Sequence, residues 1–263
     1  MSGLHGSAHT TDGVILRATP VGESDLVVAL FTRELGRVSA IARGARSSRR
    51  RFGGALGVLV HSELALGRRA RGSELWSLER ATAIADHAAL GNDPVLLGHA
   101  SYGLELVREL TPAEAPEPGA LELLLGLWRA LAPGPSPSVL RAFELALCEL
   151  LGHGVALDRC AGCGGDEALD AGAVFDPARG GAVCGGCAPT SRGAGVRPLP
   201  ATVRAYLCAA AAAPLADAAA LVVADDDRAA ARDLMLGFVG HLVGKPLRSV
   251  AFVAQVHAGL RSP

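Results

Sequence analysis

Hydrophobic and polar residues alternate in short runs along the first part of the chain. Five runs are rich in residues that favour β-strands and are separated by glycine-rich or polar breaks, at residues 11–17, 26–32, 36–43, 57–66 and 73–82. In the fourth run one face holds Val58, Val60, Ser62, Leu64 and Leu66, and the other holds Leu59, His61, Glu63 and Ala65. One apolar and one mixed face predict a strand that covers a core on one side. Five such strands predict a small barrel.

From about residue 84 the hydrophobic period changes to that of helices. Ser136 and Pro137 are typical of a helix N-cap and first turn, and Leu140, Phe143 and Leu147 then recur at spacings of three and four. Further helices are expected at residues 94–110, 121–131, 199–212, 228–243 and 249–260. The apolar stretch 206–224 contains a proline and an aspartate, so a packed helix is expected there and not a membrane span.

The two patterns together predict an α+β protein. We expect a five-stranded barrel domain at residues 1–83 and an α-helical domain at residues 84–263. The periodicity leaves open whether the barrel is an OB-fold or an SH3-like barrel. The segments 111–119 and 132–137 are rich in proline and glycine and are expected to be interhelical loops.

Four cysteines form two C-x-x-C pairs, Cys160 with Cys163 and Cys184 with Cys187. This spacing predicts one tetrahedral Zn²⁺ site in an element at about residues 158–190, carried by the helical domain. Because four thiolates leave no position for water, the zinc is expected to be structural and not catalytic. A redox dithiol pair and disulfides are the alternatives. Residues 1–13 show neither the basic start nor the apolar core of a signal peptide, which favours a cytoplasmic location over an oxidising compartment.

Charge is distributed unevenly, although the whole chain has a formal net charge of −1. Residues 1–80 hold twelve arginines against seven acidic residues, and within residues 33–71 the balance is ten against two. Such a basic region predicts a polyanionic partner. The arginines expected to contact nucleic acid are those of the third strand and of two loops: Arg37, Arg43, Arg46, Arg49, Arg50, Arg51, Arg68, Arg69 and Arg71.

Other side chains of the barrel region are expected to be structural. Phe31, Phe52 and Trp76 are predicted to pack inward, as aromatic residues of small barrels usually do. Glu23 and Asp25 are interpreted as turn or strand-end residues that form ion pairs with arginine. The chain has no P-loop, no nucleophile elbow and no His-Glu-x-x-His pair, so we expect no enzymatic activity.

Several segments resemble the bacterial recombination mediator family RecO. They are TDGVILR at residues 11–17, GESD followed by LVVALFT at 22–32, GRVSAIARGAR at 36–46 and GKPLRS at 244–249. The order of basic barrel, leucine-rich helices and C-x-x-C pairs also fits the family. Val21 stands where many members have an aromatic residue, which weakens the expectation of base stacking.

The resemblance implies an N-terminal OB-fold that binds single-stranded DNA, a helical domain and a zinc-binding element. It also implies strand annealing, partnership with RecR and single-strand binding protein, and a functional link to RecA in the nucleoid. The acidic tail of single-strand binding protein is expected to dock on the helical part, where the candidate basic residues are Arg129, Arg141, Arg204, Arg232, Lys245 and Arg248. An RNA-binding, translation-associated OB-fold and zinc-ribbon protein and an enzyme with a thiol redox centre remain alternatives.

Overall fold

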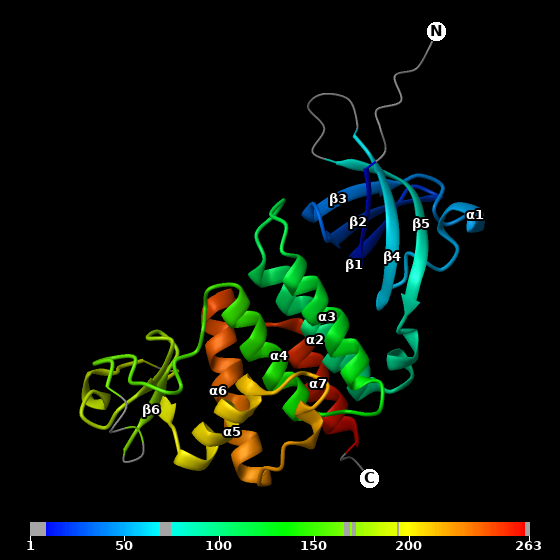
Figure 1. The fold of residues 1–263 in the computed structure, drawn as a ribbon. Helices are drawn as coiled ribbons and strands as arrows, with labels where there is room; N and C mark the ends of the chain where they lie inside the picture. Colours follow the sequence, from blue (N-terminus) through cyan, green and yellow to red (C-terminus); the bar gives the residue numbers. More distant parts are fainter. Residues whose placement is uncertain (1–8, 69–74, 166–168, 170–171, 194, 261–263) are drawn as a thin grey trace. The chain divides into compact units, whose positions relative to one another are not determined.

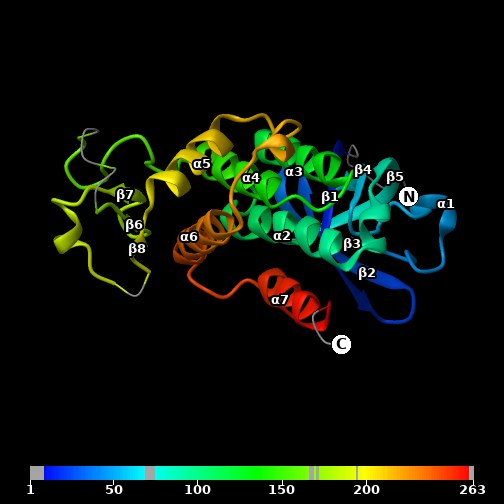
Figure 2. The same cartoon turned by 90° about the horizontal axis from the view of Figure 1, so that it is seen from below.

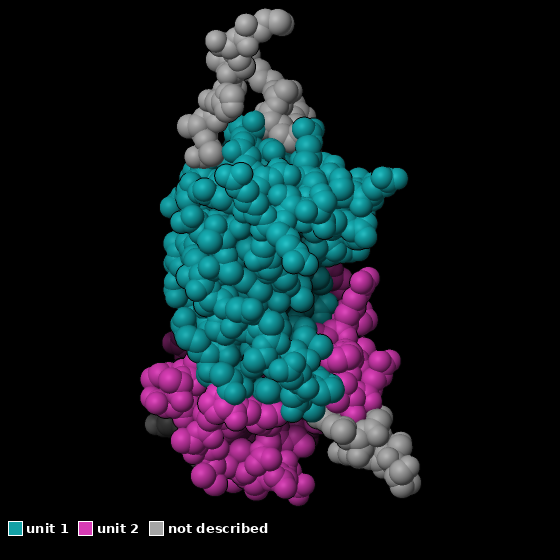
Figure 3. Space-filling model, turned by 90° about the vertical axis from the view of Figure 1, so that its right-hand side faces the viewer, with its two compact units in different colours: residues 1–132 teal, residues 133–263 magenta. Residues whose placement is uncertain are grey.

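The computed structural model describes residues 9–68, 75–165, 169, 172–193 and 195–260. The chain forms two compact units, unit 1 at Met1–Ala132 and unit 2 at Pro133–Pro263 (Figure 3). No helix among the described residues is both long enough and apolar enough to cross a membrane.

A closed five-stranded barrel forms the first part of unit 1 (Figure 1). Its strands are β1 His9–Val21, β2 Asp25–Thr32, β3 Gly36–Ala42, β4 Val60–Gly67 and β5 Trp76–Asp86. They pair in the order β1-β2-β3-β5-β4, and β4 closes the barrel against β1. All pairs are antiparallel except the short parallel pairing of β3 with β5. Five strands in this order form an OB-fold, so the α+β prediction is confirmed and the SH3-like alternative is wrong.

The alternation in β4 sets its orientation as the sequence predicts. Val60, Ser62, Leu64 and Leu66 are buried, and the Ser62 hydroxyl is satisfied because it donates to the Ala55 carbonyl oxygen at 2.9 Å. The prediction is wrong for Val58, which is 52% exposed because the strand begins only at Val60. Phe31, Phe52 and Trp76 are buried, as expected.

The helices other than α1 begin and end close to the predicted positions. The bounds of the helices are α1 Arg49–Phe52, α2 Pro94–Leu110, α3 Pro118–Leu131, α4 Pro137–Leu150, α5 Ala201–Ala212, α6 Asp225–Val243 and α7 Arg248–Leu260. The packed helix expected over residues 206–224 is an exception, because α5 ends at Ala212 and α6 begins only at Asp225. Short 3₁₀ turns lie at η1 Ala88–Asn92, η2 Ala188–Thr190 and η3 Ala218–Ala220. Ser136 caps α4 as predicted, since its side chain accepts a hydrogen bond from the Val139 amide.

Helices α2 and α3 belong to the same compact unit as the barrel. Their packing is centred on Trp128, which is buried and donates from its indole nitrogen to the Ala100 carbonyl oxygen at 3.3 Å. The helical pattern of the sequence predicts that these helices belong with the later ones and that the domain boundary lies between residues 83 and 84. The barrel ends at Asp86, close to that boundary, whereas the division into compact units comes after Ala132. The two-domain boundary therefore stays a prediction.

Unit 2 combines helices with a small sheet of strands β6 Val174–Asp176, β7 Gly181–Val183 and β8 Arg197–Pro198. The sheet lies to one side of α4, α5 and α6 in Figures 1 and 2. One continuous core joins the two parts, because Phe175 of β6 meets Phe238 of α6 edge to face with ring centroids 6.1 Å apart. The sheet includes β8, which lies beyond the predicted end of the zinc element at residue 190.

Candidate functional site

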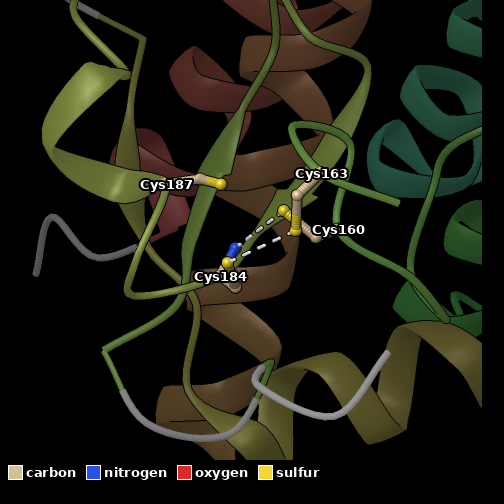
Figure 4. A group of neighbouring side chains, drawn as sticks. All are labelled: Cys160, Cys163, Cys184 and Cys187. Atoms are coloured by element: carbon tan, nitrogen blue, oxygen red, sulfur yellow. Dashed lines mark hydrogen bonds between the residues drawn. The ribbon is translucent and has the colours of Figure 1, made fainter. Parts of the chain in front are cut away.

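The four cysteines of unit 2 converge as the spacing predicts (Figure 4). Their sulfur atoms all lie within 4.8 Å of one another, and the sulfurs of Cys163 and Cys184 are 3.9 Å apart. Tetrahedral zinc with bonds of about 2.3 Å separates its sulfurs by about 3.8 Å. The four side chains therefore fit a tetrahedral metal ion of the size and softness of Zn²⁺.

A hairpin of two short strands brings the cysteine pairs together. Strand β6 follows the first pair and β7 leads directly into the second, and the two strands pair from Val174 with Val183 to Asp176 with Gly181. The first pair is fastened to β7, because the Ala161 amide donates to the Ala182 carbonyl oxygen at 2.7 Å. Cys163 and Cys184, which are 21 positions apart, thus lie in contact because the hairpin reverses the direction of the chain.

The electrostatics of the cluster favour a bound cation. Burial opposes ionisation of Cys160, but hydrogen bonds from the backbone amides of Cys184, Cys163 and Gly162 outweigh it and lower the pKa of Cys160 to about 6. Hydrogen bonding of the Cys187 thiol to Cys184 and Cys163 raises the pKa of Cys187 to about 12. A divalent cation would replace the protons that the thiols share, so all four cysteines could bind it as thiolates. Four protein ligands suit a structural role.

A basic segment, residues 43–51, follows β3 on the barrel. It holds the predicted residues Arg43, Arg46, Arg49, Arg50 and Arg51, and all five are exposed. The prediction that Arg49–Arg51 lie in a loop is wrong, because they form the single-turn helix α1. Phe52 ends this turn with its ring in the barrel core and so fixes the turn to the barrel.

Two arginines of the basic segment brace its conformation. Arg51 donates to the Arg43 carbonyl oxygen at 2.6 Å, and its guanidinium carbon lies 5.0 Å from the centre of the Phe52 ring. Arg46 donates to the Glu23 carbonyl oxygen at 3.1 Å. Asp25 accepts a hydrogen bond from the Gly44 amide at 2.7 Å, where the sequence leads us to expect a pairing with arginine.

The remaining arginines of the basic segment face solvent. Within the described part of the chain, the side chains of Arg43, Arg49 and Arg50 make no hydrogen bond or ion pair. Their guanidinium groups are available for phosphate oxygens without first breaking an internal contact. Of the predicted set, these three are best placed to contact a polyanion.

The other predicted arginines differ in their surroundings. Arg37 is half-buried and donates to the carbonyl oxygen of Arg108 at the end of α2, so part of its hydrogen-bonding capacity is used inside unit 1. The Arg68 guanidinium lies over the Trp76 ring, 4.3 Å from its centre. Arg69 and Arg71 lie outside the described residues. The structure therefore gathers five of the nine residues in one segment and places Arg37 at a helix end.

Sequence reasoning missed a charged network that joins the barrel to α3. Arg33 donates to both Asp12 oxygens, at 2.7 and 2.9 Å, and to Glu122 at 2.6 Å. His61 contacts the same Asp12 carboxylate at 2.7 Å. The hydrogen bond from Arg33 lowers the pKa of Asp12, with burial opposing this and His61 supporting it. Asp12 and Glu122 lie 21 and 89 positions from Arg33 along the chain. Because neither they nor His61 share a motif with Arg33, no local sequence signal predicts the network.

One of the six basic residues predicted to bind an acidic tail on the helical part is buried. Arg141 of α4 is 3% exposed and forms an ion pair with Glu144 in the interior of unit 2, so it cannot belong to an accessible basic rim. Arg129, Arg232, Lys245 and Arg248 are exposed, and Arg204 is half-buried. Docking of such a peptide stays a prediction.

Models of two protein families match this chain in succession. The family described as Recombination protein O N terminal matches residues 7–86, which contain the barrel. The family described as Recombination protein O C terminal matches residues 91–251, which contain the following helices and the cysteine cluster.

Similar full-length proteins bear one common name. The DNA repair protein RecO of Anaeromyxobacter dehalogenans is 41% identical over 251 residues, covering 93% of this chain and 95% of that protein. The protein of the same name from Myxococcus xanthus is 36% identical over 246 residues, covering 93% and 96%. That of Roseiflexus sp. is 33% identical over 257 residues, covering 97% and 88%.

Proposed function

Because this chain belongs to the RecO family of DNA repair proteins, we propose that it is a recombination mediator that binds and anneals single-stranded DNA and assists the loading of RecA. The observation that carries the proposal is the basic segment, residues 43–51, anchored on the barrel by Phe52. Arginines that face solvent on a rigid support can track a phosphate backbone without reading its sequence. No side chain is required to make or break a covalent bond, so the protein acts without catalysis.

Electrostatic binding is favoured over base stacking on this barrel. Phe31, Phe52 and Trp76 are all buried, and Arg68 covers the Trp76 ring. A stacking platform needs an aromatic face open to the base. Arginine–phosphate contacts also let two strands approach one surface with their bases unoccupied, which suits annealing.

The partners of the proposed function are RecR, single-strand binding protein and, functionally, RecA. Arg232 and Lys245 are exposed on unit 2, and they belong to the basic residues that we expect an acidic tail of single-strand binding protein to contact. The protein acts in the cytoplasm, on DNA of the nucleoid and without a membrane partner.

The metal of the cysteine cluster is Zn²⁺ in this proposal, held by Cys160, Cys163, Cys184 and Cys187. When bound, it cross-links the two cysteine pairs and supplies no reactive coordination position. The chain's own residues hold the β6–β7 hairpin against the core of unit 2. This arrangement supports a structural role.

A strand-annealing assay tests the proposal. Complementary DNA strands, bare or coated with single-strand binding protein, are mixed with the protein, and duplex formation is followed over time. Acceleration in both settings is expected. Absence of acceleration, or a strong preference for RNA strands in competition, would contradict the mediator assignment and favour the RNA-binding alternative.

A further inference from the structure

Arg179 of unit 2 is held in a fixed position beside the cysteine cluster. Arg179 lies in the turn between β6 and β7 and donates from Nη2 to the Thr190 hydroxyl at 2.9 Å. Its Nε is 3.6 Å from the carboxylate of Asp176, which is buried and accepts the Ala178 amide at 3.0 Å. Contacts on two sides give the guanidinium a defined position.

The position of Arg179 is adjacent to a metal ligand. A β-carbon built on Gly162 would lie 2.9 Å from Nη1 of Arg179 and 3.3 Å from Sγ of Cys187. The guanidinium and the sulfur therefore lie beside the same α-carbon, and a side chain at position 162 would press on both. Thr190, which holds Arg179, also donates from its hydroxyl to the Cys187 carbonyl oxygen at 2.7 Å.

The proposed metal centre is negatively charged, so a positively charged neighbour such as Arg179 should stabilise it. Four thiolates around Zn²⁺ carry two net negative charges, and excess charge makes the sulfurs more basic and more nucleophilic. Two amides already donate to Cys160, from Gly162 at 3.3 Å and from Cys184 at 3.2 Å. The sulfur of Cys187 lies on the side of Gly162 where a β-carbon would be, and Nη1 of Arg179 lies on that same side.

We propose that Arg179 is a positioning residue of the metal centre, whose fixed positive charge offsets the tetrathiolate and protects Cys187 from alkylation and loss of metal. The inference rests on the proposed zinc site. Asp176 contacts the guanidinium at Nε, 3.6 Å away, whereas Nη1 is the nitrogen that lies toward Gly162 and Cys187. Mutation of residues that contact metal ligands commonly lowers metal affinity by about tenfold or more.

The test compares the zinc-loaded full chain with its Arg179→Gln and Arg179→Lys variants. Arg232→Gln is the matched control, because Arg232 is exposed on α6 and pairs there with Asp233. Release of zinc to excess EDTA and alkylation of cysteine by maleimide are timed at low and high salt. We expect release and alkylation to be about tenfold faster in Arg179→Gln. Arg179→Lys should retain most of the protection and Arg232→Gln all of it. The difference in these rates between Arg179→Gln and the wild type should become smaller near 1 M salt, where the electrostatic screening length is about 3 Å.

Equal rates in Arg179→Gln and the wild type would overturn the inference. Equal acceleration in the Lys and Gln variants, unaffected by salt, would assign Arg179 a purely geometric role and would also overturn it. If Arg179→Gln does not fold, Thr190→Val replaces it, since it removes a holding contact at constant charge; wild-type rates there would count against the inference. A wild-type protein without bound zinc would instead refute the metal assignment itself.

Discussion

At the residue scale, the arginines of the barrel unit divide into side chains that brace the protein and side chains that face solvent. Arg46 and Arg51 donate to backbone carbonyl oxygens within and beside the basic segment, and Arg37 donates to the end of α2. Arg49 and Arg50 are exposed in the turn α1. Residues of the same type in one charge cluster therefore have different expected roles in DNA binding.

Replacing Arg49 and Arg50 together by alanine is expected to weaken single-stranded DNA binding without unfolding the barrel. Each lost phosphate contact reduces the slope of log affinity against log salt by about 0.7, so the double variant should flatten it by about 1.4 units. All base sequences should be affected alike. Salt titrations on mixed and homopolymer strands provide the measurement. Changing Arg192 and Arg232, both exposed in unit 2, is the charge-matched control, and an unchanged slope in the barrel variant would place the strand elsewhere.

Asp12 is expected to make the stability of unit 1 depend on acid pH. Its pKa is lowered from 3.8, chiefly by the hydrogen bond from Arg33. A lowered pKa in the folded state contributes stability that is present above the unfolded value and is lost as pH falls through the folded value. Asp12→Asn should therefore reduce the free energy of unfolding by about 1–2 kcal/mol at pH 7, and this difference should shrink below about pH 4. Chemical denaturation across pH 2.5–7 measures it, and a difference independent of pH would contradict the argument.

At the element scale, the connection between α2 and α3 is part of the barrel's structure and not only an interhelical loop. Its Glu114 amide donates to the Arg37 carbonyl oxygen at 3.0 Å, and Ala113 forms a parallel bridge with Arg37. The predicted loop at residues 111–119 thus extends the pairing of β3. This contact explains why α2 and α3 group with the barrel.

Gly36 at the start of β3 is expected to be essential to this contact. It has a φ of +64°, and a β-carbon there would lie 2.0 Å from the Ala115 carbonyl oxygen. Gly36→Ala should destabilise the protein by about 3 kcal/mol or more, because backbone strain adds to a collision with backbone. Gly22 is the control, since its φ is +60° but nothing lies within 4 Å, and Gly22→Ala should cost only about 1 kcal/mol. Equal melting temperatures for the two variants would refute the close approach.

At the scale of the whole molecule, the two compact units separate the proposed tasks. The basic segment and the barrel lie in unit 1, whereas the cysteine cluster and its core lie in unit 2. Cys160 and Cys184 belong to the same core as α4, α5 and α6, and Cys187 packs against it, so metal binding is coupled to the stability of that unit.

Removal of zinc is expected to destabilise unit 2 while the DNA affinity of unit 1 persists. EDTA treatment, or Cys160→Ser with Cys184→Ser, should lower the melting temperature by about 10 °C or more, because the metal's binding energy contributes to folding. Calorimetry with parallel DNA titrations below the transition measures both effects. A double variant that retains stoichiometric zinc would contradict the assigned ligands. A selective loss of DNA affinity in the folded apoprotein would place the DNA contact at the cysteine cluster.

Features that depend on the local order of residues can be predicted from the amino-acid sequence alone. The two-residue period of β4 predicts its buried face, Ser136 and Pro137 mark the start of α4, and the paired C-x-x-C spacing predicts the cysteine cluster. Each pattern reflects neighbours within a few residues, or a ligand geometry that requires a particular spacing. The positions of the basic residues also follow from the sequence, since charge is a property of composition.

Which residues from distant parts of the sequence come into contact is known only from the folded structure. Arg33 reaches Glu122, the start of β3 meets the connection after α2, and Arg179 lies beside Cys187. Such contacts join segments that are distant along the chain, and no periodicity encodes the direction of a long side chain toward them. An arginine available to DNA and one engaged in an internal hydrogen bond have the same local sequence signal. They differ only when folding places, or does not place, a carbonyl or carboxylate oxygen within reach.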